Sequence, residues 1–276
     1  MTRLIDGRAI AAEIADEVKG LVARAPRPPR LAVVLPSDDE AAGWYVRSIQ
    51  RTASRVGIGC QVDELFEAGA SVIARRLDVL SSDPDVDGII CQTPLPSGLR
   101  LTDVGSHIAP GKDVDGANPV SLGRLASGMP SFAPATAAAV LEILQREHVR
   151  LTGARAVVVG RSIVVGKPAA LLLLAQDATV TVCHSRTADL AAVCASADVL
   201  VAAVGRARMI GAEYIKPGAV VIDVGTNPDP SGGDGLVGDV AADEAGAAEA
   251  LTPVPGGVGP VTTMMLMLHT ARAAAG

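Results

Sequence analysis

Short runs of β-branched residues alternate with segments of helical periodicity along the whole chain. This alternation is typical of a parallel sheet covered by helices, because each parallel strand needs a crossover before the next strand can pair with it. The sequence therefore predicts an α/β fold. The expected strands are 31–35, 58–65, 86–91, 155–159, 178–183, 198–204 and 219–224, and the expected helices are 8–24, 41–56, 70–81, 136–147, 166–175, 187–195 and 261–274.

A stretch rich in glycine and proline, residues 93–134, interrupts this alternation and is predicted to be mostly loop. With 276 residues, the chain is long enough for one large domain or for two smaller domains that each bury a core. We expect two α/β domains joined near 134–150. The predicted division is 1–134 plus 256–276 for one domain and 135–255 for a Rossmann-type domain.

The charge balance excludes several classes of protein. The chain has 24 Lys and Arg against 30 Asp and Glu, a net charge of −6, and no basic run that would suit nucleic acid. No apolar run is long enough to cross a bilayer, and acidic residues recur through the first 20 positions, unlike a signal peptide. We therefore expect a cytoplasmic protein without nucleic-acid or membrane partners. Four cysteines without a CxxC pair predict reduced thiols and no metal site.

The segment RAVVVGRSIVVGKPAALLLL predicts a buried strand, a small-residue turn and a helix. Such a turn lets backbone N–H groups and the helix N-terminus approach a pyrophosphate. The candidate residues are Gly160, Arg161, Ser162, Gly166 and Pro168. Serine and valine replace the second and third glycines of GxGxxG, so an ordinary strand–turn–helix connection remains the alternative.

The end of the next strand indicates which dinucleotide would bind. A carboxylate there would favour the free 2′-hydroxyl of NAD, but the chain has His184, Ser185 and Arg186. A hydroxyl and a guanidinium, with Arg161 nearby, favour a 2′-phosphate, so we predict NADP as the cofactor. The alternative is that Arg186 is only solvated surface.

Six segments in order resemble one known family. They are VDGIICQTPLP, GKDVDGANP, GRSIVVGKPAALLLL, ATVTVCHSRT, IKPGAVVIDVG and TPVPGGVGPVT. Together they resemble the methylenetetrahydrofolate dehydrogenase/methenyltetrahydrofolate cyclohydrolase family (FolD). The resemblance implies an NADP-dependent homodimer that oxidises 5,10-methylenetetrahydrofolate to the methenyl cation in one-carbon metabolism and hydrolyses that cation to 10-formyltetrahydrofolate. It also implies that 1–134 plus 256–276 is the folate-binding catalytic domain and 135–255 the NADP-binding domain.

The same resemblance implies roles for three residues of the substrate half. Tyr45 would stack on the folate, Gln92 would join the catalytic hydrogen-bond network, and Asp115 would hold the pterin. The residue types suit these roles, because a planar pterin needs a ring face and its amino-pyrimidine edge a carboxylate. Without the resemblance, the three would be interpreted as a core aromatic, a turn cap and an Asx-turn residue.

A glycine-rich segment near the C-terminus resembles the loop that the family places beside folate and nicotinamide. It contains Pro255, Gly256 and Gly257, where missing side chains allow close backbone approach to a ligand. A rigid linker is the alternative interpretation. Thr226 stands where the family usually has an isoleucine whose backbone contacts the cofactor.

One departure from the family pattern changes the predicted chemistry. The family has Tyr-Val-x-x-Lys with a catalytic lysine, and this chain has Ile49 at the lysine position, four residues after Tyr45. Ala42 stands where the family has a serine that positions the lysine. Arg47 and Arg51 lie about 200° around a helix from position 49, so neither replaces it. Isoleucine cannot transfer a proton, so we expect oxidation to be retained and cyclohydrolysis to be impaired.

Three function classes stay open from the sequence. The first is the folate-processing NADP oxidoreductase implied by the resemblance. The second is a related NADP dehydrogenase with a different small substrate, which the altered region 36–51 would allow. The third is a non-catalytic paralogue that binds folate and NADP.

Overall fold

The computed structural model describes residues 2–230, 232 and 235–275. It contains two compact units, Met1–Ala11 with Thr136–Thr262 and Ala12–Ala135 with Thr263–Gly276. We call them the six-stranded unit and the three-stranded unit, after their main sheets. Both sheets are parallel and are packed against helices, which confirms the predicted class of two α/β domains.

The six-stranded unit has the strand order β1-β11-β8-β7-β5-β6, and every neighbouring pair is parallel. The chain starts β5 in the interior, adds β6 on one side and then β7 on the other, so the winding direction reverses next to β5. This topology confirms the predicted Rossmann-type domain. The strands are β1 (Arg3–Leu4), β5 (Arg155–Val159), β6 (Thr179–Cys183), β7 (Val199–Ala202), β8 (Val220–Asp223) and β11 (Ala250–Leu251).

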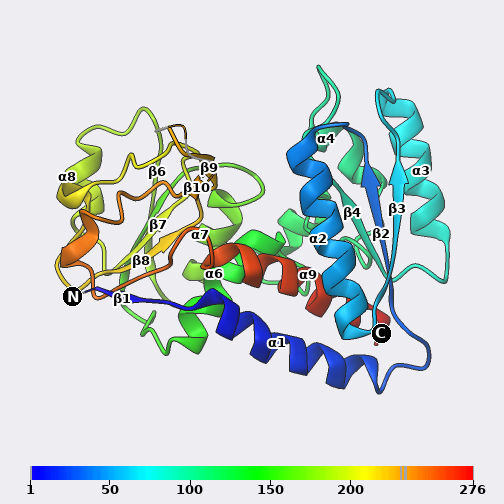
Figure 1. Ribbon diagram of the computed structural model, residues 1–276, viewed down its shortest axis with the longest axis horizontal. Coiled ribbons are helices and arrows are strands. Elements are labelled where there is room, and N and C mark those ends of the chain that lie inside the picture. Colours follow the sequence, from blue (N-terminus) through cyan, green and yellow to red (C-terminus); the bar gives the residue numbers. More distant parts are fainter. Residues whose placement is uncertain (1, 231, 233–234, 276) are drawn as a thin grey trace. The chain divides into compact units, whose positions relative to one another are not determined.

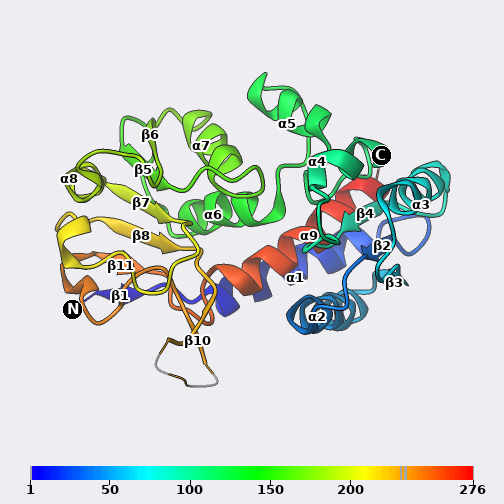
Figure 2. The ribbon, with the colours of Figure 1, turned by 90° about the horizontal axis from the view of Figure 1, so that it is seen from above.

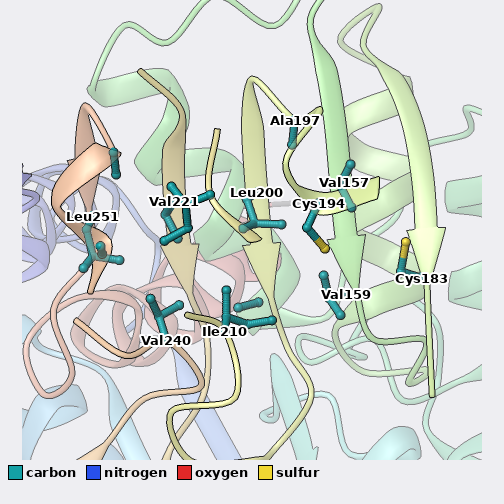
Figure 3. Packing of buried hydrophobic residues seen from close by; sticks show 14 residues of the cluster. Val157, Val159, Cys183, Cys194, Ala197, Leu200, Ile210, Val221, Val240 and Leu251 are labelled. Carbon is teal, nitrogen blue, oxygen red and sulfur yellow. The ribbon is translucent and has the colours of Figure 1, made fainter. Parts of the chain in front are cut away.

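Helices cover both faces of this sheet. Figures 1 and 2 show α6 (Ala135–Arg146) and α7 (Gly166–Leu174) on one face and α8 (Leu190–Cys194) on the other. Strand side chains alternate between the faces, and those on the α8 side form the buried cluster drawn in Figure 3, where Val157, Leu200 and Val221 come from adjacent strands. A strand buried on both faces needs a continuous apolar run, which explains why these segments are so rich in valine.

The N-terminal segment differs from the predicted division. Residues 1–11 were expected with residues 12–134, but β1 pairs in parallel with β11 at the edge of the six-stranded sheet. The backbone N–H of Ile5 extends this pairing by donating to Leu251 O over 2.9 Å. The structure also ends the six-stranded unit at Thr262 rather than at 255.

The three-stranded unit has the order β3-β2-β4, with β2 (Arg30–Leu35), β3 (Gly59–Glu64) and β4 (Gly88–Cys91). Figure 1 shows α2 (Glu40–Val56) on one face and α3 (Ala70–Ser82) on the other. Ala32 and Val34 of β2 pack against Ile73 and Leu77 of α3 in one buried cluster. Helices α1 (Gly7–Val22) and α9 (Val258–Ala274) contribute residues to both units.

The stretch 93–134 is less irregular than predicted, because it contains α4 (Leu101–Val104), the 3-10 turn η1 (Gly105–His107) and α5 (Pro119–Ala126). Helix α5 begins with a side-chain cap, in which Asn118 Oδ1 accepts from Val120 N over 2.8 Å, and Pro119 occupies the first helical position. The cap and the proline explain how so short a helix starts within a glycine-rich and proline-rich segment.

The remaining elements are short. A hairpin of β9 (Asn227–Pro228) and β10 (Leu236–Val237) follows β8, and two 3-10 turns, η2 (Ala212–Tyr214) and η3 (Ala245–Ala247), lie in the six-stranded unit. The four cysteines are free thiols, and three of them are buried. Among the residues placed by the structure, no helix combines the length and apolarity that a membrane span requires.

Candidate functional site

A pocket of about 300 Å³ lies at the carboxyl ends of β5, β6 and β7. This is the edge of the sheet next to the reversal of winding, where open α/β sheets bind their ligands. The lining contains two guanidinium groups, two serine hydroxyls and no carboxylate. The lining residues are Val159, Gly160, Arg161, Ser162, His184, Ser185, Leu190, Ala203, Val204, Arg206 and Met209.

Two glycines of the predicted cofactor turn allow close backbone packing. Gly160 has a φ of 132°, and a Cβ there would lie 2.1 Å from Ala203 O. A Cβ at Gly166 would lie 2.2 Å from Gly160 O. The start of α7 therefore packs directly onto the turn after β5, as a dinucleotide-binding turn requires. Both positions exclude any larger residue.

Ser162, at the second glycine position of the motif, has a structural role as well. Its hydroxyl accepts from Val165 N over 3.1 Å and from Gly166 N over 3.4 Å, so it satisfies backbone donors at the start of α7. This explains why serine can stand at this position without loss of the turn.

A second turn, after β6, forms the opposite side of the pocket. His184 N donates to Thr187 Oγ1 over 2.9 Å, and Arg186 N donates to His184 Nδ1 over 3.2 Å. The imidazole Nδ1 is thus an acceptor, which places the ring proton of a neutral His184 on Nε2. These bonds hold Ser185 at the pocket wall.

The structure brings together five of the predicted cofactor residues and separates four others from them. Gly160, Arg161, Ser162, His184 and Ser185 line one pocket. Three of the four others do not line it: Gly166 and Pro168 are buried in the first turn of α7, and Arg186 is exposed on the turn after β6. The fourth, Thr226, lines a different pocket.

Sequence reasoning missed the contribution of β7. Arg206 and Met209 follow β7, which pairs with β5, and both line the pocket. The signal was available in principle, because carboxyl ends of adjacent parallel strands meet at one edge. It required the strand order, which the sequence alone did not supply.

A second pocket of about 210 Å³ gathers the glycine-rich segment, Thr226 and Arg8 within the six-stranded unit. Its lining includes Asp223, Val224, Gly225, Leu236 and the segment 253–260. A Cβ at Gly7 would lie 1.8 Å from Gly257 O, so the start of α1 packs on this segment without an intervening side chain. Pro255 also lines the pocket, and Gly256 and Gly257, which have no side chains, present backbone to it.

Two buried carboxylates fix the loops between these pockets. Asp239 Oδ2 accepts from Val204 N (2.6 Å) and Gly205 N (3.0 Å), and its Oδ1 accepts from Arg206 N (2.8 Å). Asp223 accepts from three further backbone donors, and burial raises the pKa of its carboxyl to about 6. A network of this kind holds the ends of β7 and β8 in one conformation.

In the three-stranded unit, Tyr45 on α2 and Asp115 interact. Burial, the charge of Asp115 and a hydrogen bond with the Thr263 side chain all act on the Tyr45 phenol, and the first two raise its pKa above the ordinary value. Burial raises the pKa of Cys91 to about 12, and the charge of Asp115 contributes to this rise. The face of α2, the end of β4 and the loop at 115 therefore converge.

The carboxyl of Asp115 has an unusual environment. Burial raises its pKa to about 7, the neighbouring Asp113 adds to the rise, and a hydrogen bond from Ala135 N (3.1 Å) opposes it. Asp113 itself is fully buried and accepts from Ala117 N, Asn118 N and the Ser121 hydroxyl. Asp113 thus shapes the loop, whereas Asp115 has acceptor capacity left for a ligand.

Gln92 follows β4 directly, and its backbone N–H continues the sheet by donating to Val34 O over 2.9 Å. Its side-chain amide donates to Thr93 O over 2.8 Å. The amide oxygen stays available as an acceptor beside Cys91.

His269 on α9 forms a hydrogen bond with the loop that carries Asp115. Its Nδ1 donates to Val114 O over 2.8 Å, its ring lies 5.0 Å from the Phe132 ring, and burial lowers its pKa to about 4. A neutral imidazole is therefore a fixed structural donor here. The sequence did not single out His269, because no motif surrounds it.

Ile49 lies one turn after Tyr45 on α2 and is fully buried, on the apolar face that includes Ala42 and Val46. Arg47 and Arg51 are exposed, and the Arg47 guanidinium lies 4.7 Å from the Trp44 ring centre. Neither arginine points to the buried face that position 49 occupies. Among the described residues, no group of three His, Cys, Asp or Glu side chains could hold a metal ion.

A Rossmann-type sheet with a basic pocket at its carboxyl edge, in a chain with a second α/β unit, defines the class of two-domain NAD(P)-binding proteins. Residues 134–276 match the tetrahydrofolate dehydrogenase/cyclohydrolase NAD(P)-binding domain, and residues 5–115 match the catalytic domain of the same family. The chain belongs to the tetrahydrofolate dehydrogenase/cyclohydrolase family, as the sequence motifs predicted.

Individual relatives cover the whole chain. The bifunctional protein FolD of Parafrankia sp. (strain EAN1pec) is 62% identical, with 99% of this chain and 100% of the relative aligned. The bifunctional enzyme FolD of Campylobacter jejuni has a solved structure with a TM-score of 0.96 and 35% identity, covering 100% of this chain and 99% of that one. The Trypanosoma brucei enzyme, solved with NADP cofactor and inhibitor, has a TM-score of 0.93 and 38% identity, covering 99% and 97%.

Proposed function

We propose that the chain catalyses the NADP-dependent oxidation of 5,10-methylenetetrahydrofolate to 5,10-methenyltetrahydrofolate. The observation that carries this proposal is the match of both family domains along the chain, with a basic pocket at the carboxyl edge of the Rossmann sheet. The guanidinium and hydroxyl groups of that pocket suit the phosphates of NADP. The Trypanosoma brucei relative that binds NADP supports the same cofactor.

In this mechanism the chain positions the folate more than it reacts with it. Tyr45 offers a ring face to the pterin, and Asp115 in its ionised form accepts hydrogen bonds from the amino-pyrimidine edge. When bound, NADP⁺ supplies the acceptor for the hydride that leaves the methylene carbon. The adjacent folate nitrogen donates its lone pair to the resulting cation, so the step needs orientation and no general base.

The second family reaction has different requirements. Hydrolysis of the methenyl cation adds water, removes a proton from it and then breaks a C–N bond, and each proton transfer needs a group with a suitable pKa. Position 49 provides only a buried aliphatic side chain, and Ala42 beside it is buried as well. We therefore propose that cyclohydrolase activity is severely impaired while dehydrogenase activity persists.

Two assays on one preparation test both parts. We expect methylene oxidation with NADP⁺ at an ordinary enzymatic rate and methenyl hydrolysis close to the spontaneous rate. The variant Ile49→Lys with Ala42→Ser should raise hydrolysis at least about tenfold, because general acid–base catalysis contributes about 10²–10⁴-fold when the group is well placed. Ile49→Leu is the matched control, and circular dichroism verifies that each variant is folded.

Clear outcomes contradict each part. Hydrolysis by the wild-type chain at a rate comparable to oxidation would show that another group replaces the lysine. Tight NADP binding without hydride transfer from methylenetetrahydrofolate would favour a non-catalytic paralogue or a different substrate.

We also propose that the protein is a cytoplasmic homodimer. The support is membership of the tetrahydrofolate dehydrogenase/cyclohydrolase family. Light scattering coupled to size exclusion tests the dimer, and a mass of one chain, 27.9 kDa, would contradict it.

A further inference from the structure

Arg206 is the feature of the cofactor pocket that the sequence motifs leave unexplained. It follows β7, lies outside the glycine-rich turn, and still lines the same pocket as Arg161 and Ser185. Arg186, which the sequence offered as the second guanidinium, does not line this pocket. Two guanidinium groups therefore face one ligand site, and they come from the ends of β5 and β7.

The backbone that carries Arg206 is held rigidly. Asp239 is fully buried and accepts from the backbone N–H groups of three consecutive residues, Val204, Gly205 and Arg206, at 2.6–3.0 Å. Asn227 Nδ2 donates to the same carboxylate over 2.9 Å. With its backbone held in this way, Arg206 extends its side chain to the pocket from a fixed position on the chain.

The Arg206 guanidinium has no ion-pair partner in the part of the chain that the structure describes. Within the described ranges, neither the Arg161 guanidinium nor the Arg206 guanidinium forms an ion pair with a carboxylate, whereas Arg208 Nη2, two residues further on, lies 3.8 Å from Asp229 Oδ2. No acidic residue lines the pocket. Two arginines without acidic partners match a dianionic group such as a phosphate monoester.

The rest of the lining indicates where that phosphate lies on the ligand. Leu190, Ala203 and Met209 give one part of the pocket an apolar surface that suits an adenine ring. Ser185 stands at the end of β6, the position that contacts the adenosine ribose in dinucleotide-binding folds. We propose that Arg206 is a specificity-determining residue that binds the 2′-phosphate of NADP together with Arg161. This inference rests on the proposed NADP cofactor.

Binding measurements test the inference without any folate reaction. Isothermal calorimetry on wild type and Arg206→Gln should use NADP⁺, NAD⁺, adenosine 2′,5′-bisphosphate and 5′-AMP as probes. A charged hydrogen bond is worth enough for about a tenfold or greater loss of affinity for the two probes with a 2′-phosphate. NAD⁺ and 5′-AMP should change by less than about twofold, because they lack the group that Arg206 binds. Arg208→Gln is the matched control and should bind all four probes as the wild type does.

Several outcomes overturn the inference. Equal losses for NADP⁺ and NAD⁺ would place Arg206 on a part that both share, such as the adenine or the pyrophosphate. A larger loss of NADP⁺ affinity in Arg186→Gln than in Arg206→Gln would show that Arg186, in the turn after β6, binds the 2′-phosphate instead. A wild-type chain that binds adenosine 2′,5′-bisphosphate no better than 5′-AMP would refute the inference and the NADP cofactor together. Failure of folate oxidation alone would refute only the proposed substrate.

Discussion

Asp239 in the six-stranded unit and Asp115 in the three-stranded unit are both carboxylates in loops near the edge of a parallel sheet. Asp239 accepts four hydrogen bonds from its own chain, three of them from consecutive backbone N–H groups. Asp115 accepts one bond, from Ala135 N over 3.1 Å, and burial raises its pKa to about 7. The two carboxylates therefore differ in how completely the fold satisfies them.

This difference separates two uses of a carboxylate that the fold shields from solvent, fully at Asp239 and partly at Asp115. A carboxylate whose lone pairs are filled by backbone donors stabilises a loop and has little capacity left for a ligand. A carboxylate that accepts few hydrogen bonds within the fold destabilises the free protein. A ligand that donates hydrogen bonds to this carboxylate offsets that cost when it binds. On this argument, Asp239 determines the shape of the pocket at the ends of β5, β6 and β7, and Asp115 is the carboxylate that we propose for binding substrate.

The largest expected effect is on stability. Asp239→Ala should lower the free energy of unfolding by about 3–5 kcal/mol, because several buried donors lose their acceptor and each costs about 1–3 kcal/mol. Urea unfolding followed by circular dichroism measures the change. Glu244→Ala is the control, since that exposed carboxylate accepts, among the described residues, a single backbone bond, from Ala212 N over 3.2 Å. A decrease in the free energy of unfolding below about 1 kcal/mol in Asp239→Ala would contradict the structural role that separates Asp239 from Asp115.

Asp115→Asn should act on substrate instead. We expect kcat/KM for methylenetetrahydrofolate to fall about tenfold to a hundredfold, the equivalent of one charged hydrogen bond. NADP⁺ affinity should be unchanged, and stability at pH 8 should equal or exceed that of the wild type, because a buried charge has been removed. Steady-state kinetics and urea unfolding on the same preparation measure these quantities. A stability loss like that of Asp239→Ala would show that Asp115 is structural.

A smaller effect concerns the pH dependence of stability. The pKa of Asp115 is about 7 in the folded chain and about 3.9 when unfolded, so the folded state binds more protons between these values. Stability conferred at low pH is therefore lost as the pH rises through about 7. Between pH 5 and pH 8 the wild type should lose about 1–3 kcal/mol relative to Asp115→Asn. Asp223, whose pKa is also raised, is present in both proteins and cancels. Curves of unfolding free energy against pH that run parallel for the wild type and Asp115→Asn would contradict a raised pKa at Asp115.

The regular elements were predictable where a residue pattern was long enough to show a period. The predicted strand at 155–159 and helix at 41–56 match β5 and α2 to within one residue at each end. Strands β1 and β11 escaped prediction because two residues carry no periodicity, and without them nothing in the sequence indicated that residues 1–11 pair with the six-stranded sheet. Helix α5 was missed although Asn118 and Pro119 are typical of a helix start.

The strand, turn and helix around Gly160 were predictable because these elements are consecutive in sequence. The place of Arg206 was not predictable, because it depends on β7 pairing with β5, in which Ala156 is opposite Val199. The structural role of Asp239 likewise depends on the backbone N–H groups that donate to it, and no sequence pattern predicts these contacts. Position 49, by contrast, could be interpreted from sequence alone, because Ile49 lies within a recognisable motif that begins at Tyr45.

Neither unit is a continuous segment of the chain, because the six-stranded unit takes its edge strand from residues 3–4 and the three-stranded unit ends with residues after 262. During synthesis, β2, β3 and β4 leave the ribosome before Thr263, which bonds to Tyr45, and before His269, which bonds to Val114. The contacts that support Tyr45 and the loop at Asp115 are therefore completed last, when α9 has been synthesised. A truncated or nicked chain would retain most of its cofactor pocket and lose the support of Tyr45 and Asp115 first.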